Sequence, residues 1–145
     1  MTTDDIKIWL SRARAAAAEL DTLKEALTGI HARAVSVTPS YSGERVSGSK
    51  DPHKMDGYLE AVERYAELTR DRITELSEVS GEITRVIRQV KGNRERAVLI
   101  DRYLNFFSWE QIAVGQNYTF RHVTRLHGKA LLSVKGILEQ AERCP

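Results

Sequence analysis

Cysteine and long apolar runs are scarce in this chain of 145 residues. The single cysteine, Cys144, excludes an intrachain disulfide and a four-cysteine zinc site. Apolar runs reach only four or five residues, as in residues 15–18, whereas a transmembrane helix needs roughly 20. The first five residues lack the basic-then-apolar layout of a secretion signal. We therefore expect a cytoplasmic protein with no membrane segment.

Helix-breaking residues are also few, with three prolines and nine glycines, which leaves room for long helices. Hydrophobic residues make up 41% of the chain and charged residues 29%, as is typical of a globular protein. The net charge of +2 does not by itself indicate nucleic-acid binding. Its distribution is uneven, because residues 1–90 hold 13 basic and 15 acidic residues and residues 91–145 hold 9 and 5. We expect any contact with nucleic acid in the basic last third.

Two long heptad patterns predict an antiparallel pair of helices. The first helix is expected over residues 4–30, capped by Thr3 or Asp4 and ended or frayed at Gly29. Its apolar seam is Ile6, Trp9, Leu10, Ala13, Ala16, Ala17, Leu20, Leu23, Leu27 and Ile30. The second is expected over residues 52–90, with Asp51 as its cap. Its seam is Met55, Tyr58, Val62, Tyr65, Thr69, Arg72, Leu76, Val79, Ile83, Val86 and Val90. Both seams are either plain core or a surface for self-association or for a partner.

Serine, glycine and proline dominate the stretch between these helices, which shows no period. The expected organisation is therefore an N-terminal helix (1–33), a flexible linker (34–52), a long helix (53–92) and a C-terminal helix-turn-helix domain (93–145). The expected fold class is all-α.

The last third predicts three helices in a helix-turn-helix layout. Asn93 is expected to cap the first, over residues 94–106. Ser108 and Gln111 have the spacing of a capping box for the second, and Thr119 is expected to cap the third, over residues 120–140. Gly115 or Asn117 is expected to take a positive φ in the turn.

The third of these helices presents basic and hydrogen-bonding side chains near its start, where a recognition helix reaches base edges. The candidate DNA contacts are Ser108, Thr119, Arg121, His122, Thr124, Arg125 and Lys129. Arginine can bind guanine bidentately, and backbone N–H groups at a helix start can bind phosphate. The alternative is a small three-helix bundle with a solvated charged face.

Residues 94–138 resemble region 4 of bacterial sigma factors. The matching segments are Asp101-Arg102-Tyr103-Leu104, Ser108-Trp109-Glu110-Gln111-Ile112-Ala113, Tyr118-Thr119 and Val123-Thr124-Arg125-Leu126-His127-Gly128-Lys129-Ala130-Leu131. The front of the chain, with two long helices around a Ser/Gly-rich loop, resembles phage late-gene regulators of the ArpU and RinA type. This resemblance covers most of the chain from Asp51 on and, more loosely, the first helix. The resemblance implies a DNA-binding transcription regulator, with Trp109, Ile112, Val123 and Leu126 holding the two helices together. Nothing resembles the sigma segment that melts promoters, so we do not expect a stand-alone sigma factor.

No pattern of catalytic or metal-ligating residues stands out. His122 and His127 are five residues apart and so lie on different faces of a helix, and phosphate-binding glycine loops and nucleophile elbows are absent. We expect no enzyme activity and no cofactor. Two rivals to a regulator of double-stranded DNA remain open. One is a DNA-recognition subunit like a phage small terminase, and the other is an adaptor that binds RNA polymerase.

Overall fold

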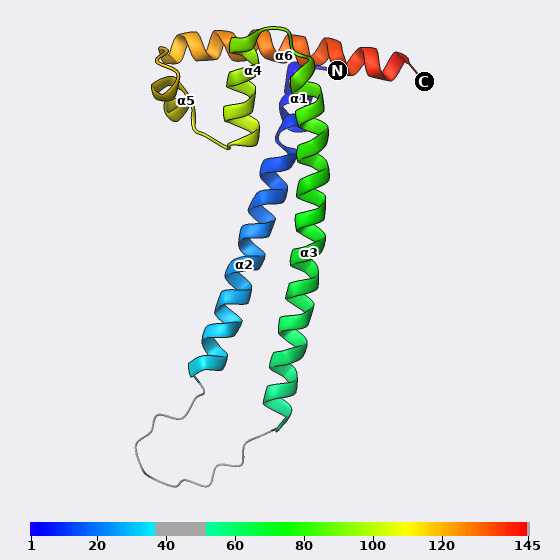
Figure 1. Cartoon of the computed structure of the whole chain (residues 1–145), viewed down its shortest axis with the longest axis vertical. Helices are drawn as coiled ribbons and strands as arrows, with labels where there is room; N and C mark the ends of the chain where they lie inside the picture. Colours follow the sequence, from blue (N-terminus) through cyan, green and yellow to red (C-terminus); the bar gives the residue numbers. More distant parts are fainter. Residues whose placement is uncertain (37–51, 145) are drawn as a thin grey trace. The chain divides into compact units, whose positions relative to one another are not determined.

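A computed structural model describes residues 1–36 and 52–144, and these are all-α, as predicted, without any strand. The helices are α1 (Thr3–Leu10), α2 (Arg12–Ser36), α3 (Pro52–Gln89), α4 (Asn93–Leu99), α5 (Trp109–Gly115) and α6 (Phe120–Arg143), with a π-helical turn η1 (Ile100–Leu104) (Figure 1). They form two compact units, one of residues 18–74 and one that joins residues 1–17 to residues 75–145. The predicted cap Asp51 and most of the predicted linker lie outside the described residues.

The first predicted helix is interrupted at Ser11, between α1 and α2. The cap of α1 is Thr2 rather than Thr3 or Asp4. The Thr2 hydroxyl accepts from the Asp5 N–H (3.2 Å), while the Asp5 carboxylate accepts from the Thr2 N–H (2.7 Å). This reciprocal capping box satisfies two backbone donors at once, which favours Thr2. The predicted end at Gly29 and the predicted linker start at residue 34 are wrong, since α2 continues to Ser36.

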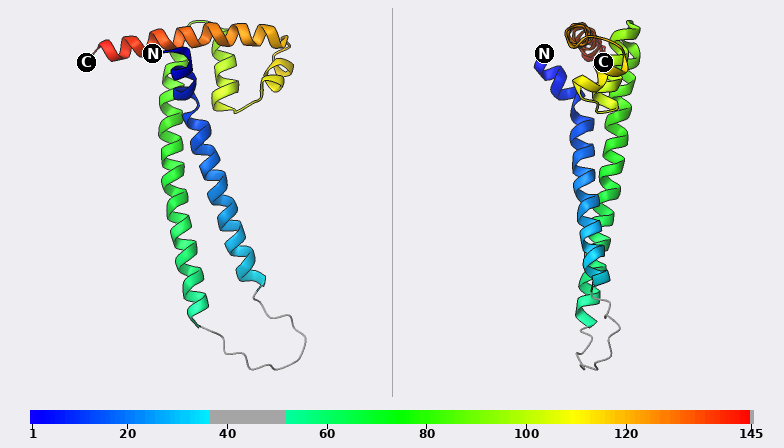
Figure 2. Two further views of the ribbon diagram at one scale, coloured as in Figure 1. Left: turned by 180° about the vertical axis from the view of Figure 1, so that it is seen from behind. Right: turned by 90° about the vertical axis from the view of Figure 1, so that its left-hand side faces the viewer.

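The unit of residues 18–74 is an antiparallel pair formed by α2 and α3, which run side by side in both views of this unit (Figures 1 and 2). Glu19 pairs with Arg72 (3.1 Å), and the His31 ring Nδ1 lies 3.1 Å from the Tyr58 hydroxyl. Its core is thin, because Leu20, at 7% exposure, is the one buried hydrophobic side chain among those described in this unit. Met55 is the one exposed residue of the predicted α3 seam among those described in this unit, and the other residues of that seam are half-buried, whereas Leu59 and Ile73 beside the seam are exposed.

The other unit buries its apolar side chains among α1, the start of α2, the end of α3, α4, η1 and α6. This core consists of Ile6, Leu10, Ala13, Ile83, Ile87, Val90, Leu99, Tyr103, Ala130, Leu131 and Val134. The predicted boundary at residue 93 therefore does not separate the compact units. The buried stripe of α6 continues beyond the helix-turn-helix, and residues 1–17 and 75–90 help to cover it.

The helix predicted over residues 94–106 also differs in the structure. Gly92 rather than Asn93 occupies the cap position, without a side-chain cap, and α4 passes into η1 at Ile100. The Asn105 N–H donates to the Ile100 carbonyl (2.9 Å), five residues back, which defines the π geometry. Phe106 then adopts a φ of 60° and ends the helix. The widened turn carries Tyr103 into the core at 6% exposure.

Candidate nucleic-acid interface

The helix-turn-helix starts with the capping box that its sequence predicts. The Ser108 hydroxyl accepts from the Gln111 N–H (3.2 Å), and the Gln111 side-chain oxygen accepts from the Ser108 N–H (2.8 Å). In the turn, Asn117 rather than Gly115 takes the positive φ, at 55°. Thr119 then caps α6 by accepting from the His122 N–H (3.2 Å). The two predicted caps are thus confirmed.

A second, smaller core holds α5 against the start of α6. It consists of Val98, Ile112, Val123 and Leu126, with Trp109, Ala113 and Tyr118 packed around them. Ile112 and Val123 have no exposed surface. Trp109, Ile112, Val123 and Leu126 are the residues expected to join the two helices, and the structure places all four in this cluster. A packed cluster of this kind fixes α6 relative to α5, so the exposed face of α6 is rigidly presented.

The cationic candidates lie in one row on the exposed face of α6. Arg121, Arg125 and Lys129 follow one another at intervals of four residues, and all three side chains are exposed. Val123 and Ala130, on the opposite face, are fully buried. None of the three cations forms a hydrogen bond or ion pair within residues 1–36 and 52–144. The row is about 12 Å long, which covers roughly three to four base pairs of B-DNA.

The other candidates are not equally available. The Ser108 and Thr119 hydroxyls accept backbone N–H groups as helix caps, and the Thr124 hydroxyl donates to the Phe120 carbonyl (3.0 Å). His122 is half-buried, and its ring meets the Tyr118 ring edge-on with centroids 4.7 Å apart. The structure therefore brings Arg121, Arg125 and Lys129 together, and places His122 and Ser108 chiefly in supporting contacts.

A buried histidine beside this row was not among the predicted site residues. His127 is 7% exposed, its Nε2 lies 2.8 Å from the Tyr103 hydroxyl, and the Trp109 ring meets it edge-on at 4.7 Å. Burial, with smaller effects of Lys7 and Arg102, lowers the pKa of His127 to about 4, and burial raises the pKa of Tyr103 to about 12. Both groups are therefore neutral at pH 7. The helical period of the sequence could have indicated that His127 is buried. Position 127 falls on the buried face shared by residues 123, 126, 130 and 134.

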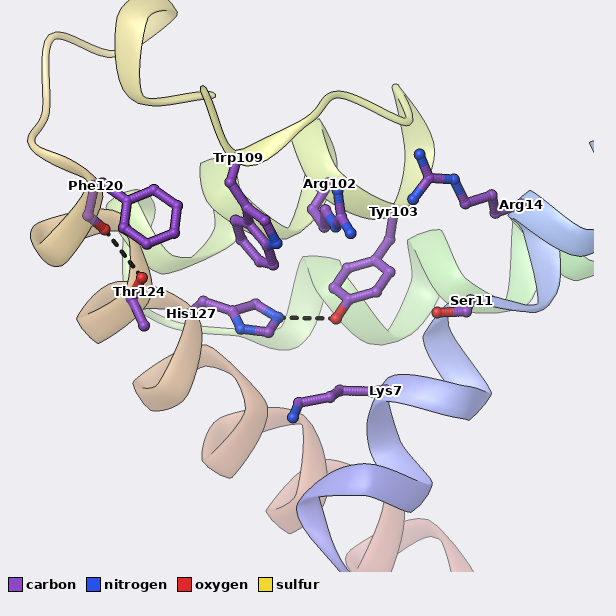
Figure 3. A pocket seen from close by; sticks show the side chains of 9 residues that line it. All are labelled: Lys7, Ser11, Arg14, Arg102, Tyr103, Trp109, Phe120, Thr124 and His127. Carbon is purple, nitrogen blue, oxygen red and sulfur yellow. Dashed lines mark hydrogen bonds between the residues drawn. The ribbon is translucent and has the colours of Figure 1, made fainter. Parts of the chain in front are cut away.

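These neutral groups line a cavity of about 440 Å³ that also exposes three cations, Lys7, Arg14 and Arg102 (Figure 3). Lys7 comes from α1 and Arg14 from α2, and no pattern in the sequence predicts that these helices lie beside α6. No cluster of histidine, cysteine or carboxylate side chains within the described parts of the chain could hold a metal ion. Likewise, none of the described helices is both long and apolar enough to cross a membrane.

Comparison with known proteins gives no match to this chain among protein-family models, curated proteins or solved structures.

Proposed function

We propose that this chain is a sequence-specific regulator of transcription that binds double-stranded DNA, with the start of α6 in the major groove. The observation that carries the proposal is the row of Arg121, Arg125 and Lys129, exposed and unpaired among the described residues, on a helix fixed by a packed neighbour. Surface cations of a globular protein need not lie in a row on the exposed face of one fixed helix. Here the row runs from the first turns of the helix, where recognition helices reach base edges.

The charges and helix spacing suit both parts of DNA recognition. Arg121 and Arg125 can each bind a guanine through two hydrogen bonds, which discriminates against a wrong base by about 1–3 kcal/mol. Lys129, one turn further along, is placed to neutralise a phosphate. The resemblance to phage regulators agrees with this role and adds the cytoplasm of a bacterial host and its RNA polymerase as the proposed setting and second partner.

The test begins with selection of duplexes from a random pool, followed by fluorescence anisotropy on the selected and a scrambled duplex. The native chain should prefer the selected duplex by at least about 10³-fold and lose affinity steeply with salt. Arg125→Lys keeps the charge but loses the bidentate geometry, so it should reduce the preference while the salt slope stays. Lys129→Gln should lower affinity for both duplexes and reduce the salt slope by about one.

The matched control is Lys135→Gln on the same helix. Lys135 lies near Glu139 (3.9 Å), beyond the three-residue row, so its removal should leave the preference unchanged. Enrichment of no sequence, or equal effects of Lys135→Gln and Arg125→Lys, would contradict specific recognition by this row.

One observation favours self-association as part of this function. On α3, Leu59 and Ile73 lie two heptads apart and are 50% and 49% exposed, and Met55 is 61% exposed. A second copy of the chain could cover this row in a four-helix arrangement, which would also give a DNA-binding dimer two recognition helices. Sedimentation should then show a dimer that Leu59→Lys with Ile73→Lys converts to monomers. A ring of many subunits would instead favour a role like that of a small terminase.

If the chain is a protein-interaction adaptor, the exposed apolar row on α3 should contribute to partner binding and the cations of α6 should not. Arg121→Ala with Arg125→Ala separates the two functions. If the chain regulates transcription through DNA, this double variant should lose duplex binding. It should stay folded, because both side chains are exposed. An adaptor predicts no duplex binding by the native chain and unchanged binding of RNA polymerase by the variant.

A further inference from the structure

The cavity beside α6 is built from distant parts of one compact unit. It has a volume of about 440 Å³, within the range of small-molecule sites. Its walls come from α1, Ser11, the start of α2, η1, and the starts of α5 and α6 (Figure 3). All of these segments belong to the unit of residues 1–17 and 75–145.

The charged side chains that line this cavity are all cations, namely Lys7, Arg14 and Arg102. Arg14 is exposed and forms no hydrogen bond or ion pair within the described chain. Lys7 contacts the Asp4 carboxylate at 3.0 Å, but the Asp4 side chain is 80% exposed, so this pair is weak and readily exchanged. With His127 and Tyr103 neutral, nothing in the wall balances the three positive charges.

Arg102 is held in place from two sides. Its guanidinium lies 4.4 Å from the centroid of the Trp109 ring, and its Nη1 donates to the Phe107 carbonyl (3.0 Å). A guanidinium has five donors, so the remaining N–H groups stay available. The side chain is therefore oriented before any ligand arrives, which lowers the entropy cost of binding.

The rest of the wall consists of aromatic rings and hydroxyl groups. Tyr103, Trp109 and Phe120 contribute rings, and Ser11 and Thr124 contribute hydroxyls. In Figure 3, the Trp109 and Phe120 rings lie on one side of His127, and Lys7 lies on the other. Flat apolar walls favour a ring, and the three cations favour a carboxylate or phosphate.

We propose that this cavity binds a small organic anion, a carboxylate or phosphate group carried on a flat ring. Phe120 and Thr124 line the cavity from the same helical turns that carry Arg121 and Arg125, so the ligand would bind next to the proposed DNA contacts. A small molecule bound there would therefore affect the position of α6, the proposed recognition helix. The same chemistry, a ring with a phosphate, is also present in a nucleotide of the bound DNA, so the experiment separates these two sources.

The two tryptophans of the chain allow a direct measurement. Trp9 lies outside the cavity wall, so Trp9→Phe leaves Trp109 as the only tryptophan and as a reporter within the wall. Titration of this variant with phenyl phosphate should change its fluorescence saturably. Benzyl alcohol, which has a ring but no charge, and inorganic phosphate, which has the charge but no ring, should each bind at least about tenfold more weakly.

Cation variants in the Trp9→Phe background test the residues. Arg14→Gln should weaken phenyl phosphate binding at least about tenfold, because it removes a charge-assisted contact from an otherwise unpaired group. Lys135→Gln, which removes a cation of α6 outside both the wall and the proposed DNA-binding row, should leave it unchanged. Absence of a saturable change, equal binding of benzyl alcohol, or equal effects of the two variants would overturn the proposal. Circular dichroism checks that the variants keep their helical content.

Duplex binding then separates the sources. If the natural ligand is a free small molecule, Arg14→Gln should keep its affinity for the selected duplex. Phenyl phosphate should then shift this affinity only when Arg14 is present. Loss of duplex binding in Arg14→Gln, with competition between duplex and phenyl phosphate, would assign the anion to the DNA backbone and overturn the small-molecule source. Phenyl phosphate binding by a chain that binds no duplex would overturn the proposed DNA function and leave the cavity assignment intact.

Discussion

Acid should destabilise the unit of residues 1–17 and 75–145 through one side chain, His127. In the folded chain this ring is buried against Tyr103 and Trp109, with Lys7 and Arg102 nearby, and its pKa is about 4 instead of 6.5. Between pH 4 and pH 6.5, the His127 ring carries a proton in the unfolded chain but not in the folded chain. Stability is therefore complete above pH 6.5 and falls as the pH drops from 6.5 toward 4.

The size of the loss follows from the two pKa values. Lowering the pH from 7.5 to 5.0 should reduce the free energy of unfolding by about 2 kcal/mol through His127 alone. The measurement is urea unfolding at several pH values, followed by circular dichroism at constant ionic strength. His127→Gln can still bond the Tyr103 hydroxyl but does not titrate. Subtracting its curve from that of the native chain removes the contributions of the other histidines and the carboxylates.

Parallel stability curves for the native chain and His127→Gln over this pH range would refute the reasoning. Because the variant also loses two ring contacts, it could fail to fold, and a second measurement is therefore needed. NMR titration of the His127 ring in the native chain gives its pKa directly. A midpoint at or above 6.5 would mean that the ring is not held neutral by burial.

Three further predictions concern the stability of the helix-turn-helix, measured by urea unfolding. Ser108→Ala removes the hydroxyl that caps α5 and should cost about 1 kcal/mol, whereas Ser133→Ala, whose hydroxyl bonds the preceding turn of α6, should change stability little. Ile112→Ala empties a fully buried position of the second core and should cost about 2–5 kcal/mol, and Val114→Ala, at a position that is 79% exposed, is its control. Asn117→Gly relieves a positive φ of 55° and should be neutral or stabilising, while Asn117→Val should destabilise by at least about 1 kcal/mol; equal stability of these two variants would contradict the turn geometry.

The parts of the fold that could be predicted from the sequence depend on residues that are close together in the chain. Ser108 and Gln111 have capping-box spacing, Thr119 precedes an amphipathic run, and each cap depends on residues within one helical turn. The apolar periods also placed Ile6 and Ile83 correctly in the core. The DNA contacts of Arg121 and Arg125 rest on the same local pattern and stay predictions.

The parts that were missed depend on tertiary contacts. The Ser11 break and the π-helical turn fit helices to a shared core, and neither has a glycine or proline to mark it. The positive φ of Phe106 is unusual for a bulky residue and could not be predicted from residue type. Likewise, Lys7 and Arg102 are 95 positions apart in the sequence, so no local pattern joins them in one cavity wall.

The division of one core between the two ends of the chain has a consequence for its biosynthesis. Ile6, Leu10 and Ala13 precede their partners Ala130, Leu131 and Val134 by at least 117 positions, the separation of Ala13 from Ala130, so they are synthesised well before them. At a synthesis rate of about 5–20 residues per second, the interval is on the order of ten seconds. During that time the apolar side chains of the earlier segment lack these partners, and α6 gains its full support only when both segments have been made.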